Sequence, residues 1–384
     1  MTTPPFLPGL ELSRRFYQEA VRPLLDEAAP GLVHSAARLG PGSEVLGFDT
    51  ARSADHEWGP RLTLFLSPGD AERHGARLHQ LLAEQLPKTF LGYPTHFAPT
   101  GEAGIGVMRE TTGPVAHRVE ITEPGRWFTG LLGFDPLAGA PTLADWLSTP
   151  AQRLAEVTGG AVFHDGLGTL GPARARLAWY PPEVWRYVLA CQWQRIAQEE
   201  AFPGRCGEAG DELGSAVVAA RLVRELMRLC LLMARRYPPY SKWLGSAFAR
   251  LPEADALRPH LTGTLAAVDW PTREAHLTRA YEAVGALHNR LGLTGHVDPA
   301  TRPYHARPYR VLHAERFVAA LTARLTDPAL RALPLTGTVD QFADSTDLLV
   351  SPPLARAATG AVAGVPGMAV PSRQGTGGVP DGAP

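Results

Sequence analysis

Residues 40–66 have the sequence GPGSEVLGFDTARSADHEWGPRLTLFL, and its most informative part is the triplet Asp55-His56-Glu57. On a strand, residues two apart project from the same face, so Asp55 and Glu57 would point together and His56 to the opposite, packed face. Two adjacent carboxylates repel each other unless a cation lies between them, and Mg²⁺ prefers such oxygen ligands. The triplet therefore predicts a strand that presents a magnesium site at Asp55 and Glu57.

A Gly42-Ser43 turn precedes this triplet in the same stretch. A turn with glycine lets backbone N–H groups approach phosphate oxygens closely, and a helix starting after it would add a favourable dipole. The Ser43 hydroxyl can donate one more hydrogen bond. A phosphate cradle followed by metal-binding carboxylates is what nucleotidyl transfer requires, because metal ions bind the triphosphate and align the acceptor oxygen. A plain turn followed by a solvated strand face is the structural alternative.

The periodicity of apolar residues changes in the middle of the chain. The first half mixes strand patterns at 61–66, 117–121 and 161–164 with helical patterns, of which one starts at Ser67 with Pro68 and an acid three residues on. From about residue 182 to 325 nearly every segment has helical periodicity. These patterns predict an α+β protein. We expect a mixed α/β domain over 1–172, a helical bundle over 173–330, a segment over 331–350 that packs back on the body, and a disordered, Gly- and Pro-rich tail over 351–384.

Composition excludes several classes of protein. The chain has 384 residues and a formal net charge of −1, which argues against a nucleic-acid partner. Its three cysteines have no metal-type spacing, its start lacks a signal pattern, and it has no run of apolar residues long enough to span a membrane. We therefore expect a cytoplasmic protein with no membrane partner. The sequence also lacks the phosphate loop, dinucleotide-binding and nucleophile-elbow motifs of common ATPases, dehydrogenases and hydrolases.

The pattern of Gly42-Ser43, spacer and Asp55-x-Glu57 resembles the signature of the DNA polymerase β-like nucleotidyltransferase superfamily. The layout is similar to that of the aminoglycoside-type nucleotidyltransferases, in which an α/β catalytic domain precedes a helical bundle. Within this superfamily, three stretches resemble the family called domain of unknown function 4037: GSEVLGFDTxRSxDHEWGPRL, RYPPYSKWLGSAF and VDQFADSTDLL. The resemblance implies that Asp55 and Glu57 are catalytic residues that bind metal.

Superfamily members often carry a third carboxylate on a neighbouring strand between apolar residues, and Glu120 in Val119-Glu120-Ile121 has this form. The resemblance implies that Glu120 is either the third metal ligand or the general base that acts on the acceptor hydroxyl. An exposed acid on a strand would have the same sequence pattern.

Two further positions carry hypotheses. Lys242 is one of only two lysines, and its ammonium could reach the triphosphate from the helical domain; a surface lysine near a helix start is the alternative. Asp340, Asp344 and Asp347 recur at three- and four-residue steps, which would place them on one face of a helix. We interpret these three acids as a solvated face, with binding of a cationic substrate as the alternative.

These patterns predict a Mg²⁺-dependent nucleotidyltransferase. It would move a nucleoside monophosphate from an NTP, with ATP as the expected donor, to an acceptor hydroxyl and release pyrophosphate. The resemblance to the aminoglycoside-type enzymes implies that this acceptor is a small molecule. Gly42, Ser43 and Lys242 would bind the nucleotide, and protein AMPylation is a variant of the same chemistry. The rival hypothesis is a non-catalytic module that binds a nucleotide or metabolite. Glutamate at position 57, where aspartate is common, and the early Gly59-Pro60 favour the rival.

Overall fold

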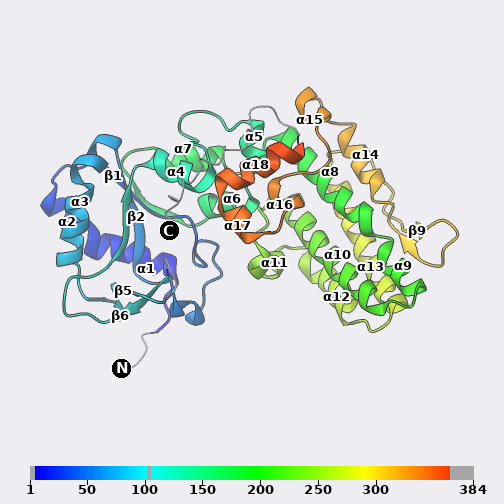
Figure 1. The fold of residues 1–384 in the computed structure, drawn as a ribbon, viewed down its shortest axis with the longest axis horizontal. Coiled ribbons are helices and arrows are strands. Elements are labelled where there is room, and N and C mark those ends of the chain that lie inside the picture. The colour runs from blue at the N-terminus through cyan, green and yellow to red at the C-terminus, as the bar shows by residue number, and fades with distance from the viewer. Residues whose placement is uncertain (1–4, 102–104, 364–384) are drawn as a thin grey trace, which may run out of the picture.

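A small mixed sheet and a large helical part make up the α+β structure, a computed structural model that describes residues 5–101 and 105–363 (Figure 1). The sheet has the strand order β7-β2-β1-β8. Strand β1 is antiparallel to both of its neighbours, whereas β2 and β7 are parallel. The strands are β1 (His34–Arg38), β2 (Arg61–Leu66), β7 (Arg118–Thr122) and β8 (Ala161–Asp165). The strands predicted at 61–66, 117–121 and 161–164 are thus confirmed as β2, β7 and β8.

The two faces of β2 contact different parts of the molecule. Leu62, Leu64 and Leu66 alternate along the strand and pack in one apolar cluster with α1 (Gly9–Phe16) and α3 (Pro68–Gln85). Phe65 faces the other way and joins a second cluster that continues into the helical part. Arg61 and Thr63, which share the Phe65 face, therefore lie on the side of the sheet toward that second cluster.

Local sequence signals explain where the helices of the α/β part begin. The Ser67 hydroxyl accepts a hydrogen bond from the Asp70 N–H at 3.2 Å and Pro68 follows it, so the predicted start of α3 is confirmed. A π-helical turn (Tyr17–Val21) separates α1 from α2 (Arg22–Ala28), directly before Pro23, whose missing N–H interrupts the regular hydrogen-bond pattern.

Short elements complete the α/β part, and one further strand pair, β9 with β10, lies in the helical part. Three two-stranded pairs are formed by β3 (Thr89–Phe90) with β4 (Tyr93–Pro94), β5 (His96–Pro99) with β6 (Gly106–Arg109), and β9 (Arg302–Pro303) with β10 (Arg310–Val311). Four helices precede the helical part: α4 (Pro124–Leu132), α5 (Leu143–Ser148), α6 (Ala151–Thr158) and α7 (Leu170–Arg176). Pro150 separates α5 from α6, because a proline cannot continue the helix that precedes it.

Helices dominate the second half, as the periodicity between residues 182 and 325 predicts. They are α8 (Pro182–Glu199), α9 (Phe202–Glu208), α10 (Glu212–Met233), α11 (Ser241–Phe248), α12 (Ala254–Ala266), α13 (Trp270–Arg290), α14 (Glu315–Thr322) and α15 (Pro328–Ala332). One apolar cluster runs from Phe65 and Phe128 in the α/β part to Val188 and Leu222 in the helical part, so the two parts share a core. None of the described helices is both long and apolar enough to cross a membrane.

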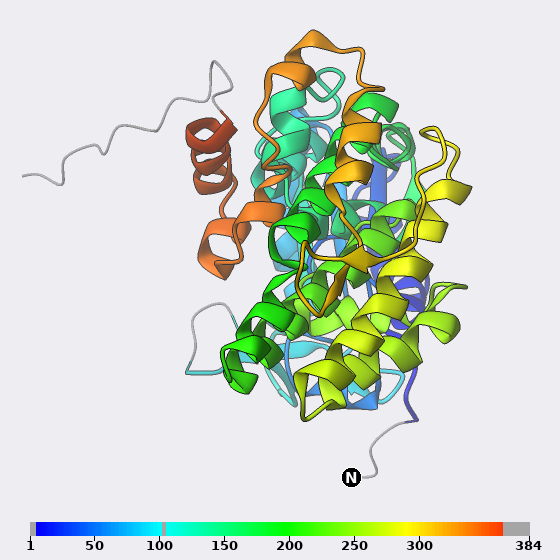
Figure 2. The same ribbon diagram turned by 90° about the vertical axis from the view of Figure 1, so that its right-hand side faces the viewer.

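The C-terminal segment forms three short helices beside the body of the molecule: α16 (Val339–Phe342), α17 (Thr346–Val350) and α18 (Pro352–Ala363) (Figure 2). The expected disordered tail is therefore wrong for residues 352–363. Helix α18 packs against α5 and buries Ala355 and Thr359, because small side chains allow the close approach that the composition argument overlooked. Arg356 adds an ion pair with Asp145 of α5. Residues 364–384 lie outside the described residues.

Candidate active site

A cavity of about 650 Å³ lies between the α/β part and the helical part. One wall is the loop between β1 and β2, of which residues 41–58 supply the lining; we call it the loop wall. The opposite wall comes from α6, α10, α11 and the Pro238–Tyr240 segment before α11; we call it the helical wall. Residues of α16 and α17 also line the cavity. Ligand sites often occur at such a junction between two parts of a protein.

The structure brings five of the six predicted site residues to this cavity. Gly42, Ser43, Asp55 and Glu57 line it from the loop wall, and Lys242 lines it from α11. The sixth is on β7, outside the cavity: Glu120 accepts a hydrogen bond from the Thr63 hydroxyl at 3.2 Å and lines a separate hollow of about 340 Å³.

The strand predicted for Asp55-His56-Glu57 is wrong. Asp55 ends a 3₁₀ helix (Ala51–Asp55) that begins with a reciprocal cap between Thr50 and Ser53, Glu57 has a φ of 43°, and β2 starts only at Arg61. The cap favours a turn, and Gly59-Pro60 delays the start of the strand. The side chains of Asp55 and Glu57 consequently do not share a strand face.

The three residues of the triplet have different partners. His56 is exposed rather than packed, and its Nδ1 lies 2.9 Å from Oδ1 of the exposed Asp55. The carboxylate of Glu57 accepts hydrogen bonds from Nη2 of Arg118 at 2.6 Å and from the Gly106 N–H at 2.5 Å. Within residues 5–101 and 105–363, no three His, Cys, Asp or Glu side chains are grouped as metal ligands. The predicted trio of Asp55, Glu57 and Glu120 is therefore not assembled in this conformation.

A buried ion cluster lies beneath the Gly42-Ser43 turn. Glu44, only 2% exposed, accepts hydrogen bonds through Oε1 from Nε of Arg38 at 2.7 Å and from Nη2 of Arg61 at 2.8 Å. Burial alone would raise the pKa of Glu44, but Arg38 and Arg61 outweigh it and hold the pKa below its usual value. A Cβ atom at position 42 would lie within 3 Å of all three of these side chains, so the close packing over the cluster requires glycine there.

The turn leaves backbone donors available on the cavity side. The N–H groups of Val45, Gly47 and Phe48 donate to the carbonyls of residues 42–44 and hold the turn in place. The N–H groups of Gly42 and Ser43 have no hydrogen-bond acceptor within the described part of the chain. Backbone N–H groups that lack a protein acceptor can donate hydrogen bonds to an anion bound beside them.

The helical wall presents a cation on an aromatic surface. Nζ of Lys242 lies 5.0 Å from the ring centroid of Trp243, and it has no acidic partner within the described residues. On the loop wall, Phe48 stacks on the same indole with the two rings 5.2 Å apart. Contacts between the two walls thus fix the position of α11 beside the turn.

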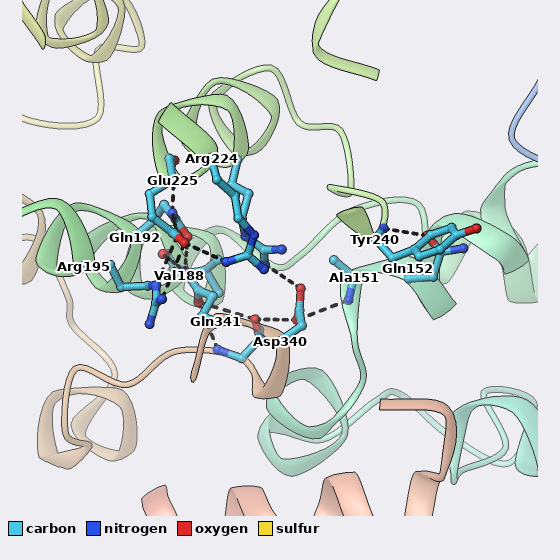
Figure 3. A network of polar contacts seen from close by, with 12 residues as sticks. Ala151, Gln152, Val188, Gln192, Arg195, Arg224, Glu225, Tyr240, Asp340 and Gln341 are labelled. Carbon is cyan, nitrogen blue, oxygen red and sulfur yellow. Dashed lines mark hydrogen bonds and ion pairs between the residues drawn. The ribbon is translucent and has the colours of Figure 1, made fainter. Parts of the chain in front are cut away.

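The interpretation of Asp340, Asp344 and Asp347 as one solvated face is wrong for Asp340. Asp340 is buried on α16, where its Oδ2 pairs with Nη2 of Arg228 at 2.6 Å, whereas Asp347 belongs to the separate helix α17. Figure 3 shows Asp340 directed toward α10 and toward Ala151, whose N–H donates to Oδ1. The arginine on α10, together with the Ala151 N–H and the Thr338 hydroxyl, compensates for this burial, since an unpaired carboxylate would not be buried there.

A polar network extends from this pair along α8 and α10 (Figure 3). Nε2 of Gln341 donates to Oε1 of Gln192 at 2.9 Å, and Nε2 of Gln192 donates to Glu225 at 2.7 Å. Glu225 also pairs with Arg195 at 3.1 Å and with Arg224 at 2.8 Å. This network ties the C-terminal segment to the helical part at the end of the cavity.

The predictions from sequence missed Arg38, Glu44, Arg61 and Arg228, although each stands out in its local pattern. Arg38 stands between Ala37 and Leu39 at the end of β1, and Arg228 interrupts the apolar stripe of α10. Charged residues at such positions are rarely buried unless they are paired. A charged residue in an apolar pattern is thus a candidate for a buried ion pair, but the pattern does not show which residue it pairs with.

Comparisons with known proteins give a family and a distant structural likeness. Residues 146–244, which include α6, α10 and the start of α11, match the family described as Domain of unknown function (DUF4037), so the resemblance to that family is confirmed over this segment. No curated protein matches the chain.

A nucleotidyltransferase-like protein from Exiguobacterium sibiricum 255-15 is among the solved structures that match. It is 12% identical, with 84% of this chain and 91% of that chain covered, and the TM-score is 0.30. At this TM-score the two folds are too different for an argument from one to the other.

Proposed function

We propose that this chain, which carries a DUF4037 segment at 146–244, is a nucleotidyltransferase that binds an NTP with Mg²⁺ in the cavity and transfers the nucleoside monophosphate to an acceptor hydroxyl. One observation carries the proposal. Gly42, Ser43, Asp55 and Glu57 share the cavity with Lys242, although they come from the two opposite walls. The matched segment supplies most of the helical wall, so the cavity is bounded by the part of the chain that the family shares.

The phosphates would bind at the turn. The free N–H groups of Gly42 and Ser43 and the Ser43 hydroxyl supply donors, and Lys242 supplies a positive charge from the opposite wall. Together they would hold a triphosphate between the two walls and restrict its orientation relative to the acceptor.

Magnesium would arrive with the nucleotide. Mg²⁺ keeps several waters and is commonly held by one or two carboxylates together with substrate phosphates, rather than by a cage of protein ligands. The exposed Asp55 suits such a site as it stands, whereas Glu57 would first have to exchange its hydrogen bond with Arg118. The bound ion would neutralise charge on the phosphates. Because Glu120 lines another hollow, we give it no part in this reaction.

The acceptor we propose is a small hydroxylated molecule, and a protein hydroxyl is the variant. One observation favours the second candidate function, a nucleotide-binding module without turnover: Arg118 and Gly106 hold Glu57 away from the role of metal ligand. Release of pyrophosphate separates the two functions, since a binding module retains its NTP unchanged.

Calorimetric titration of ATP and of a non-hydrolysable analogue, with and without Mg²⁺, tests the proposal. We expect Mg²⁺-dependent binding to the wild-type protein and its loss in the Asp55→Ala/Glu57→Ala double variant. Lys242→Ala should weaken binding about tenfold, because one charge-assisted contact is lost. Lys88→Ala is the matched control: Lys88 is the other lysine, and it donates to the Gly113 carbonyl away from the cavity.

Absence of binding to the wild-type protein by any NTP would refute both the transferase and the nucleotide-binding module. Binding that the double variant retains would place the nucleotide elsewhere. If nucleotide binds as expected, a screen of hydroxylated acceptors with pyrophosphate release as the readout decides between enzyme and module.

A further inference from the structure

We propose that Arg224 and Arg228, one turn apart on α10, form an anion-binding subsite in the helical wall, and that the acceptor therefore carries a carboxylate or phosphate group. Both arginines line the cavity, on the wall opposite the Gly42-Ser43 turn. The subsite itself stands on the residues described below. Its assignment to the acceptor, rather than to another anion, rests on the proposed function.

Arg228 has an unused donor inside the protein. The residue is 5% exposed, and Nη2 pairs with Asp340 at 2.6 Å, but the buried Nε has no hydrogen-bond partner within residues 5–101 and 105–363. A buried donor without an acceptor is unfavourable, so such donors are normally satisfied by a water or a ligand. Arg228 also lines the cavity, so an anion bound there would be the acceptor that this donor lacks.

The charges around Arg228 leave an excess of positive charge. Three arginines, Arg195, Arg224 and Arg228, pair here with two carboxylates, those of Glu225 and Asp340. Arg224 and Arg228 also stand at an i, i+4 spacing on one helix face, where like charges repel. An anion placed between them would remove both the repulsion and the excess charge.

Other charges on the helical wall do not supply that anion. Glu156 on α6 is already paired with Arg153 at 2.7 Å, and Asp344 is exposed to solvent on the segment between α16 and α17. A carboxylate or phosphate matches the planar donor edge of a guanidinium better than a neutral group does. The proposed phosphate cradle for the NTP is on the loop wall, so the arginines are free for a second anionic group.

The test uses the full-length protein and inorganic phosphate as the probe, because the acceptor is unidentified. Phosphate is titrated calorimetrically with and without a saturating non-hydrolysable ATP analogue and Mg²⁺. The variants are Arg224→Gln and Arg228→Lys; the second keeps a positive charge beside Asp340 but removes Nε. Arg221→Gln is the matched control, since Arg221 is on α10 but pairs with Glu199 outside the cavity. Thermal melting verifies that each variant is folded.

We expect phosphate to bind the analogue-loaded wild-type protein and the Arg221→Gln control alike. Both cavity variants should bind phosphate at least tenfold more weakly while their affinity for the analogue changes less than twofold. If Arg228→Lys does not fold, the half-buried Arg224 decides the question alone.

Three results would overturn the subsite. Phosphate that does not bind the wild-type protein would mean that a water satisfies Nε. Equal phosphate binding by all variants would place the anion elsewhere. Equal losses of phosphate and analogue would assign the arginines to the nucleotide. If the analogue binds nowhere, the proposed function fails, but the phosphate titrations without analogue still decide the subsite by the same variants.

Discussion

The loop wall and the helical wall face each other across one cavity, but different interactions stabilise them. The loop wall has irregular backbone, with a 3₁₀ helix and left-handed φ angles, and it rests on Glu44, buried between Arg38 and Arg61. The helical wall consists of regular helices whose backbone groups are paired locally, and α10 buries an apolar stripe that includes Leu222 and Leu226. The loop wall therefore combines a small buried ion cluster with a few apolar contacts such as those of Val45 and Trp58, whereas the helical wall depends on many apolar contacts.

Two buried carboxylates show the same contrast. Glu44 in the loop wall is held by guanidinium groups, and its pKa lies below the usual value despite burial. Glu200 in the helical part is held by the N–H groups of Leu312, His313 and Ala314, and burial raises its pKa to about 7. Charged partners compensate for desolvation of a carboxylate, whereas neutral donors compensate for it only in part. The contributions of the two residues to stability should therefore have opposite pH dependence.

The largest expected effect is that of Glu44→Gln. The substitution leaves the buried Arg38 without a counter-charge and Arg61 with only its longer pair to Glu57 at 3.6 Å, and it should lower the free energy of unfolding by about 3–5 kcal/mol. Chemical denaturation measures it. Glu19→Gln, which removes an exposed carboxylate paired with Arg15, is the control and should change little. A loss at Glu44 no larger than that of the control would show that the loop wall does not depend on this cluster.

The next effect concerns pH. The pKa of Glu200 is about 7 in the folded protein and near 4.5 in the unfolded chain, so the folded state binds more protons between these values. Its contribution to stability is present below pH 4.5 and is lost as the pH rises through 7, by about 3 kcal/mol in total. Denaturation of the wild-type protein and of Glu200→Gln from pH 4.5 to 8 should show this decline only in the wild type. If the free energy of unfolding changes with pH equally in both proteins, Glu200 does not cause the decline. The proposed difference in pH dependence between Glu200 and Glu44 would then be wrong.

Asp340→Asn should have a smaller effect, about 2 kcal/mol. It removes the charge that pairs with Arg228 but keeps an oxygen that can accept from Ala151 and Thr338. Denaturation gives the stability, and limited proteolysis should show faster cleavage between α16 and α18. Asp347→Asn, on the exposed side of α17, is the matched control. Similar cleavage of both variants would mean that the Arg228 pair does not hold this segment.

The smallest effect is expected for Arg356→Gln on α18. Its pair with Asp145 is partly exposed and should contribute less than about 1 kcal/mol, because solvent screens it and two side chains must be ordered. The buried Ala355 and Thr359 should keep α18 in place. Circular dichroism measures whether α18 stays helical, and chemical denaturation measures the free energy of unfolding. A loss of stability as large as that of Asp340→Asn would show that the Arg356–Asp145 pair contributes as much as the Arg228–Asp340 pair.

Prediction from sequence succeeded where structure is local. The alternation in RLTLFL specifies β2, and Ser67-Pro68 specifies the start of α3, because each signal acts within a few residues. Prediction failed at Asp55-His56-Glu57, where a strand pattern competes with the Thr50–Ser53 cap and with an ion pair to Arg118, far along the chain. It also failed at Asp340, whose three- and four-residue spacing from other acids says nothing about the arginine opposite it.

The sequence by itself determined the α+β organisation and identified five residues that line the cavity, because periodicity, capping and short motifs are encoded in neighbouring residues. Tertiary structure decided the rest: the conformation of the triplet, the buried cluster under Gly42, the burial of Asp340 and the placement of Glu120 outside the cavity. Each of these depends on which polar and charged groups from different segments meet, and the Glu44 and Asp340 carboxylates meet their arginines in a region of low dielectric. A buried charge is stable only beside its partner, and the fold brings those partners together.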